Sequence, residues 1–147
     1  HQSGSMDDLF FLVKTGRVSN AKAFFGSMLG LKLMADFNER GMVEVMGKCK
    51  GKRAMLDSAV AYIAQTIEDP AEQTIVITHS ARESLAQAYA ERIRAQIRPR
   101  EILFVNLGKA CGASIGPGLC AAFYFGMPTS QGAVREKEIL TQILSGK

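Results

Sequence analysis

The sequence is poor in the residues that most metal and redox sites require. It has 2 histidines, His1 and His79, which nearly excludes a histidine-rich metal site. Its 3 cysteines form no CxxC pair, and an odd number argues against a disulfide framework. We therefore expect reduced cysteines, no metal and no cofactor.

Long apolar runs and sorting signals are missing too. The longest runs, LFFLV and LCAAFYF, fall far short of the roughly 20 residues that cross a bilayer. No charged segment followed by an apolar one marks a signal peptide. We expect a cytoplasmic protein without a membrane span. The stretch HQSGS shows no helix-like or strand-like pattern of apolar residues. We therefore interpret residues 1–5 as an expression scar and residues 6–147 as the native domain.

Features of nucleotide and nucleic-acid binding are weak. The formal net charge is +4, and neither basic cluster, in 48–53 or 92–100, is interleaved with aromatic residues. A single-strand binding groove combines both features, so we expect no nucleic-acid partner. The glycine-rich stretch 108–118 has neither the Walker spacing nor GxGxxG, and a strand-like apolar run follows it. A phosphate cradle usually opens a helix, so this stretch argues against one.

The pattern of apolar residues predicts an α/β domain. The expected elements are helices over 9–16 and 21–30, a hairpin of 31–37 and 42–48, a helix over 51–67, a strand over 74–80, a helix over 80–96, strands over 100–108 and 119–126, and a helix over 133–144. Ser80 and Glu83 have the spacing of a capping box. We expect a two-layer sandwich in which a mixed β-sheet carries its helices on one face.

The glycine-rich stretch is the main candidate for a site. Residues 116–118, Gly-Pro-Gly, predict a bend, and the small residues in 110–113 allow a ligand or another backbone to approach closely. Three interpretations stay open: a crossover loop that serves only the fold, the mouth of an apolar site, or a hydrolase site that uses Cys111 or Ser114 with His79. The hydrolase interpretation lacks a third catalytic group and a nucleophile elbow.

Several stretches together resemble the C-terminal domain of the DegV family. LFFLVKTGRVS, GLKLMADFNERG, a basic run before a helix and IGPGLCAAFYFG follow the family's order, and the resemblance runs from Leu9 to the last helix. It implies the fatty-acid-binding domain of a bacterial two-domain carrier. Such a carrier is not itself an enzyme and presents a long-chain fatty acid to a fatty acid kinase. The resemblance also implies a missing N-terminal domain that supplies hydroxyl groups to the carboxylate. The alternative is an interaction or regulatory module of the same fold that binds no lipid.

The resemblance also assigns residues. Ser114 stands where the family usually has a carboxylate-binding histidine; a serine donates a hydrogen bond but lacks the imidazolium charge. Arg17 matches the family's GRIS segment, where we expect it mainly to brace its loop. The expected fatty-acid site comprises Arg17, Phe24, Phe25, Met28, Ser114, Ile115, Gly116 and Phe123. Ordinary core packing is the alternative role of its apolar members. Lys50 and Arg53 are expected to face the kinase, and His79 is interpreted as structural.

Overall fold

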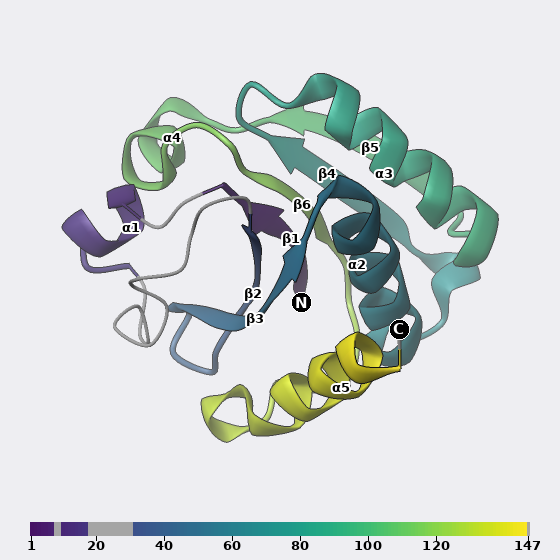
Figure 1. Cartoon of the computed structure of the whole chain (residues 1–147). Helices are drawn as coiled ribbons and strands as arrows, with labels where there is room; N and C mark the ends of the chain where they lie inside the picture. The colour runs from purple at the N-terminus through teal and green to yellow at the C-terminus, as the bar shows by residue number, and fades with distance from the viewer. Residues whose placement is uncertain (8–9, 18–30, 147) are drawn as a thin grey trace.

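The computed structural model describes residues 1–7, 10–17 and 31–146 (Figure 1). Its sheet has six strands in the order β3-β2-β1-β6-β4-β5. Strands β4 and β5 pair in parallel, whereas the other neighbouring strands pair antiparallel. The expected α/β fold with a mixed sheet is confirmed.

Most expected elements form close to their expected bounds. The elements of the described residues are β1 (Gln2–Met6), α1 (Phe10–Lys14), β2 (Leu31–Phe37), β3 (Val43–Lys50), α2 (Lys52–Thr66), β4 (Thr74–His79), α3 (Glu83–Gln96), β5 (Glu101–Asn106), α4 (Lys109–Ile115), β6 (Cys120–Phe123) and α5 (Val134–Ser145), with short 3-10 helices at Pro70–Glu72 and Gln131–Ala133; β1 and α4 were not expected. The hairpin, strands β4 to β6 and helices α2, α3 and α5 confirm the sequence-based expectation. The helix expected over 21–30 lies outside the described residues.

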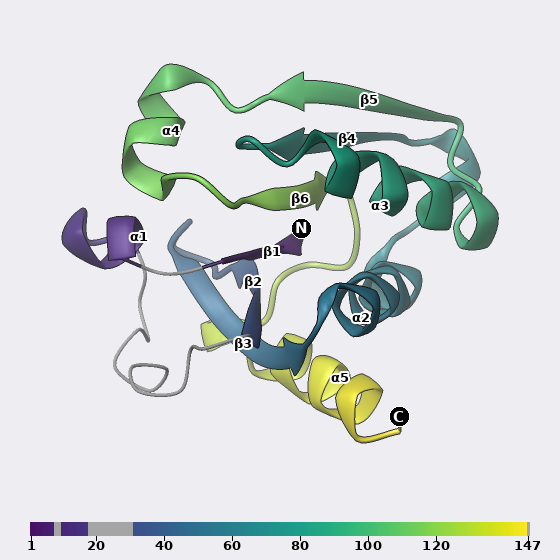
Figure 2. The same ribbon diagram turned by 45° about the horizontal axis from the view of Figure 1, so that its top comes forward.

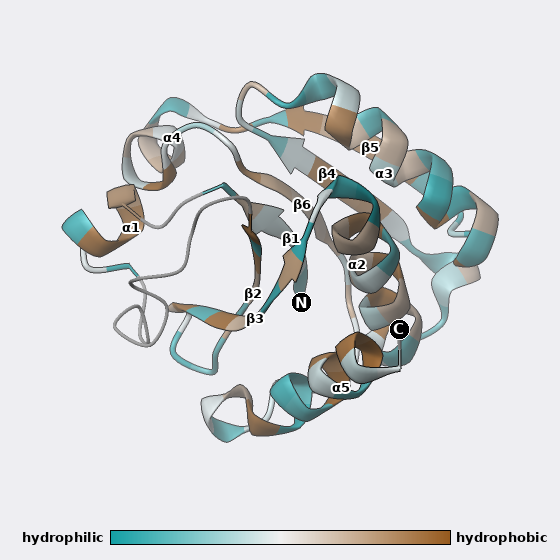
Figure 3. Ribbon diagram, in the orientation of Figure 1, coloured by the Kyte–Doolittle hydropathy of each residue, from teal (hydrophilic) through white to brown (hydrophobic). Residues whose placement is uncertain are grey.

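The sheet separates a large apolar core from a smaller one. Helices α2, α3 and α5 gather on one side of the sheet, and α1 and α4 lie together on the other (Figures 1 and 2). Successive side chains of a strand point to opposite faces of the sheet, so one strand contributes residues to both cores. In β6, Cys120 and Ala122 belong to the large core, whereas Ala121 belongs to the smaller one. Along α3 and α5, hydrophobic and hydrophilic segments alternate, as in helices with one buried face (Figure 3).

The expectation that residues 1–5 stand outside the fold is wrong. Strand β1 lies inside the sheet between β2 and β6, and all five of its residues are buried. Ser3 Oγ donates to Ala59 O over 3.1 Å, and Tyr89 OH donates to Ser3 O over 3.1 Å. Buried polar groups are tolerated when they are hydrogen-bonded. The polar composition hid this strand because periodicity arguments depend on apolar residues.

The expected capping box at Ser80 is also wrong. Helix α3 begins at Glu83, with Arg82 as its N-cap residue and no side-chain cap. Ser80 Oγ instead donates to Gly116 O over 2.8 Å and accepts from Leu119 N over 3.1 Å. Ser80 therefore fixes the Gly-Pro-Gly bend against the end of β4.

Candidate functional site

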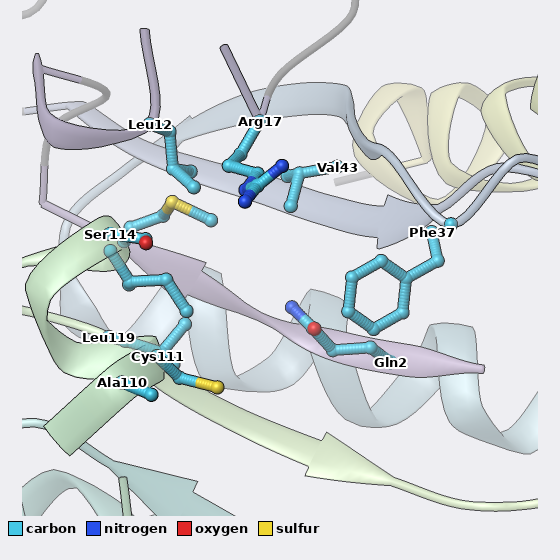
Figure 4. A pocket seen from close by; sticks show the side chains of 12 residues that line it. Gln2, Leu12, Arg17, Phe37, Val43, Ala110, Cys111, Ser114 and Leu119 are labelled. Atoms are coloured by element: carbon cyan, nitrogen blue, oxygen red, sulfur yellow. The ribbon is translucent and has the colours of Figure 1, made fainter. Parts of the chain in front are cut away.

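A cavity of about 310 Å³ lies on the sheet face that carries the smaller core (Figure 4). Its lining residues are Gln2, Met6, Leu12, Arg17, Phe37, Gly41, Val43, Ala110, Cys111, Ser114, Ile115 and Leu119. Most of these side chains are apolar, and the few polar ones come from β1, the segment after α1, and α4. Apolar walls with a few polar groups are typical of a site for a small organic ligand.

Strand β1 forms the floor of the cavity. Gln2 and Met6 both line it, and at 3.3 Å per residue they lie about 13 Å apart along the strand. Gly4 lies between them on the same face, because strand side chains alternate with a period of two. A Cβ at Gly4 would lie 2.3 Å from Cys120 O, so β6 packs directly against this glycine. The segment that we interpreted as a scar thus shapes the site.

Helix α4 closes one end of the cavity. Ala110, Cys111 and Ser114 lie at this end, and the ring of Phe37 lies at the other (Figure 4). The glycines of this stretch predict a loop, because glycine disfavours a helix, whereas Lys109–Ile115 forms a helix in the structure. Gly116 ends α4 with φ of 76°, and a Cβ there would lie 2.2 Å from the Phe11 ring. Glycine is therefore what lets α1 pack against the end of α4.

Arg17 and Ser114, two members of the expected fatty-acid site, both line this cavity. The backbone of Arg17 fixes its segment: its N–H donates to Leu12 O over 2.8 Å, and its carbonyl accepts from Val43 N over 3.0 Å. Its guanidinium points into the cavity (Figure 4). Ser114 lies in the last turn of α4, and its carbonyl accepts from Thr15 Oγ1 over 3.4 Å. The cavity wall thus carries a hydroxyl group at the α4 end, from Ser114, and a positive charge from Arg17 between that end and Phe37 (Figure 4).

The other expected site residues fall in different places. Ile115 lines the cavity, whereas Gly116 is not among its lining residues. Phe123 lines a second cavity, and its ring centroid lies 6.3 Å from that of Phe37. Outside the described residues lie Phe24, Phe25 and Met28.

Sequence reasoning did not assign several lining residues to the site. These are Gln2, Met6, Leu12, Phe37, Gly41, Val43 and Leu119. The alternation of apolar residues in the hairpin could have indicated Phe37, because it places Phe37 on the same face as Leu33 and Ala35. No such signal existed for Gln2, since its place depends on the pairing of β1 with two strands distant in sequence.

Asp7 ties the segment before α1 to the rest of the domain. Its carboxylate forms ion pairs with Lys32 of β2 and with Arg82 at the start of α3. Partial burial on its own would raise the pKa of Asp7, but hydrogen bonds and charges from these two cations outweigh it and lower the pKa. The charged carboxylate therefore anchors the segment that leads to α1 beside the cavity.

His79 lies away from the candidate hydrolase nucleophiles. It ends β4, and its Nδ1 accepts from Arg82 N over 3.4 Å. It lines a separate cavity of about 220 Å³, whereas Cys111 and Ser114 line the first cavity. The geometry gives no support to a hydrolase site that joins His79 to Cys111 or Ser114.

In the described ranges, no group of three or more His, Cys, Asp or Glu residues could hold a metal ion.

Lys50 and Arg53 are exposed residues where β3 ends and α2 begins. Leu31 pairs with Lys50, and Leu33 pairs with Lys48 and Met6, so Lys50 lies at the Met6 end of the sheet. Arg53 Nε lies 3.9 Å from Asp57 Oδ2, one helical turn further on.

Among the helices of the described part, none has the length and apolar character needed to cross a membrane.

Comparison with known sequences places the chain in a family. The model of the family described as "Uncharacterised protein, DegV family" matches residues 5–126. A DegV domain-containing protein from Clostridium perfringens is 34% identical over 122 residues, which cover 83% of this chain and 42% of that protein. The chain therefore spans less than half the length of this relative.

Solved structures give the same result. A DegV family protein from Thermus thermophilus, described by its fatty acid binding, is 26% identical with a TM-score of 0.76, over 86% of this chain and 45% of that one. The Streptococcus pneumoniae Fatty Acid Kinase (Fak) B3 protein, loaded with linoleic acid, shares the fold at 21% identity, with a TM-score of 0.70 over 84% of this chain and 43% of that one. With the match over residues 5–126, these findings show that the chain belongs to the DegV family.

Proposed function

We propose that this chain is the fatty-acid-binding domain of a DegV carrier and that the first cavity holds the acyl chain. The observation that carries the proposal is the make-up of this cavity: a mostly apolar space of about 310 Å³ with Arg17 and Ser114 near α4 and α1. Burying an acyl chain there removes its methylenes from water, at about 0.8 kcal/mol for each CH₂. The Thermus thermophilus relative, which is described by its fatty acid binding, supports this ligand class.

Two polar groups of the cavity, those of Arg17 and Ser114, suit a carboxylate. A buried carboxylate without partners is very unfavourable, so a fatty-acid site needs donors where the head group lies. The Arg17 guanidinium can form two charge-assisted hydrogen bonds with one carboxylate, and the Ser114 hydroxyl can donate a third. In this proposal Arg17, which matches the family's GRIS segment, supplies the positive charge, since Ser114 stands where the family usually has a histidine. The N-terminal domain implied by the resemblance completes the site with its own hydroxyl groups.

The domain acts as a carrier and not as an enzyme, in the cytoplasm, and it presents the bound acid to a fatty acid kinase. The exposed cations Lys50 and Arg53 face the kinase. Lys50 lies at the Met6 end of the sheet, toward α1 and α4, so a partner bound there would approach the head group. The name of the Fak B3 protein, which has the same fold, supports a kinase partner. Lys50→Glu with Arg53→Glu should weaken kinase binding and leave fatty-acid binding intact.

A charge placed in the cavity wall tests the proposal. Ile115→Asp puts a carboxylate among the lining residues, and we expect it to abolish binding of oleic acid by the full-length protein, measured by calorimetry. Val134→Asp is the matched control, because Val134 is 56% exposed on α5 and does not line this cavity. Equal oleic acid binding by wild type and Ile115→Asp, both with cooperative unfolding, would place the lipid elsewhere. No binding by the wild type would favour the lipid-free interaction module.

A further inference from the structure

A second cavity, of about 420 Å³, borders Phe37. Its lining residues are His1, Asp36, Phe37, Thr74, Val76, Phe123, Tyr124, Phe125 and Thr129. Val76 pairs directly with Phe123, and Phe123 packs against the smaller core, which places both on the face of the first cavity. Phe37 lines both cavities, so it borders both spaces.

Two aromatic rings stand at this border. The rings of Phe37 and Phe123 lie 6.3 Å apart between centroids, tilted by 39°. Both residues are half-buried, unlike the fully buried side chains of the large core. The first cavity extends from α4 to Phe37, so the ring of Phe37 forms its far wall (Figure 4).

The second cavity also suits an apolar tail, although Asp36 lines it. Asp36 Oδ1 accepts from Gln2 N and from Phe37 N, each over 2.7 Å. Asp36 Oδ2 accepts from Tyr62 OH over 2.8 Å and lies 2.6 Å from His1 Nδ1. A carboxylate offers about four acceptor positions, and these contacts use them. The charge is therefore satisfied from the protein side, and the aromatic residues and Val76 supply the apolar walls.

We propose that Phe37 and Phe123 form a gate that sets the length of the bound acyl chain, and that the second cavity receives the tails of longer chains. This inference rests on the proposed function, in which the carboxylate lies at the α4 end of the first cavity. The terminal methyl group of a chain that fills the first cavity then meets the Phe37 ring. A longer chain must displace this ring to reach the space between Val76 and Phe125. Phe37 is thus a specificity-determining residue.

The test compares saturated acids of increasing length, from lauric to behenic acid, bound to the full-length protein. Phe37→Ala removes the shared wall, and we expect the preference for the longest acids over myristic acid to rise about tenfold, since roughly two further methylenes leave water. Adding Val76→Phe to Phe37→Ala refills the second cavity and should restore the wild-type profile. Phe10→Ala is the control, because Phe10 is 62% exposed and lines neither cavity. Phe37→Leu provides the same comparison if the alanine variant does not fold.

The possible failures are distinguishable. If the wild type binds none of the acids, the proposed function itself is wrong. If the wild type binds them and both Phe37 variants keep its length profile, the fatty-acid site stands and the gate is wrong. A shift that Val76→Phe does not reverse would place the longer tails outside the second cavity and would also overturn the proposal.

Discussion

His1 Nδ1 lies 2.6 Å from Asp36 Oδ2, and both side chains are 1% exposed. His1 Nε2 lies 2.7 Å from Met127 O, so both ring nitrogens have oxygen partners. A protonated imidazole can donate to both oxygens at once, whereas the neutral ring can donate to only one of them. This contact joins the start of β1 to the end of β2 and to the segment after β6.

The His1–Asp36 contact predicts a pH-dependent stability. Burial alone would lower the pKa of His1, but the hydrogen bond and charge of Asp36, together with the hydrogen bond to Met127 O and the charge of Glu136, outweigh it and raise the pKa. A group whose pKa rises on folding stabilises the fold below its unfolded pKa, about 6.5, and this contribution is lost as the pH rises through the folded value. The urea midpoint of the wild type should therefore fall relative to that of His1→Gln as the pH rises above about 6.5. Parallel pH profiles of the two proteins would contradict the prediction.

Gly116→Ala tests the contact between α1 and α4. The new methyl group would meet the Phe11 ring at 2.2 Å, and φ of 76° is unfavourable for alanine. We expect a loss of about 1–3 kcal/mol in the free energy of unfolding, measured in urea. Gly108→Ala is the control, because Gly108 has φ of −60° and a methyl group there would meet nothing within 4 Å. Equal midpoints for the two variants would show that Gly116 is not required.

Deletion of residues 1–5 tests the place of β1. The deletion removes the strand between β2 and β6 and leaves the unpaired edges of both strands exposed. It also removes Ser3, the acceptor of the buried Tyr89 hydroxyl group. We expect the loss of cooperative thermal unfolding, followed by circular dichroism. A truncated chain that unfolds at the wild-type temperature would contradict a structural role for β1.

Arg17 and Ser114 should act on the head group and not on the tail. Arg17→Ala should weaken oleic acid binding by the full-length protein about tenfold to a hundredfold, as expected when hydrogen bonds to a charged group are lost. Oleyl alcohol, which has the same chain without the carboxylate, should bind to both proteins equally. Ser114→His, which restores the family's usual residue, should strengthen oleic acid binding. Displacement of a fluorescent fatty acid measures the affinity of the wild type and of both variants for oleic acid, and that of the wild type and Arg17→Ala for oleyl alcohol. Equal losses for acid and alcohol would mean that Arg17 only shapes the cavity.

The sequence predicted the elements whose pattern is local. In α2, Leu56, Val60 and Ile63 repeat at helical spacing, and all three are buried as expected. The hairpin also followed from its alternation, with Gly41 at φ of 70° in the turn. Such elements carry their own pattern, because one face of each packs against a core.

The missed elements depend on partners far away in the sequence. Strand β1 is polar, and its Ser3 is hydrogen-bonded to Tyr89 and Ala59, which no local pattern reveals. Helix α4 contains a glycine and is held through Gly116 and the contact with α1. The resemblance pointed to one end of the cavity, at Ser114, whereas the floor and the far wall at Phe37 required the sheet order.

The central claim is that this fold carries a fatty acid, and mass spectrometry of organic extracts tests it most directly. The extracts would come from the purified chain and from a version that includes any upstream coding sequence, both exposed to the same mixed lipid pool. We expect a long-chain fatty acid in the extended protein and less in this chain, because a second domain completes the carboxylate site. Fatty acid in neither protein would show that the fold does not carry one.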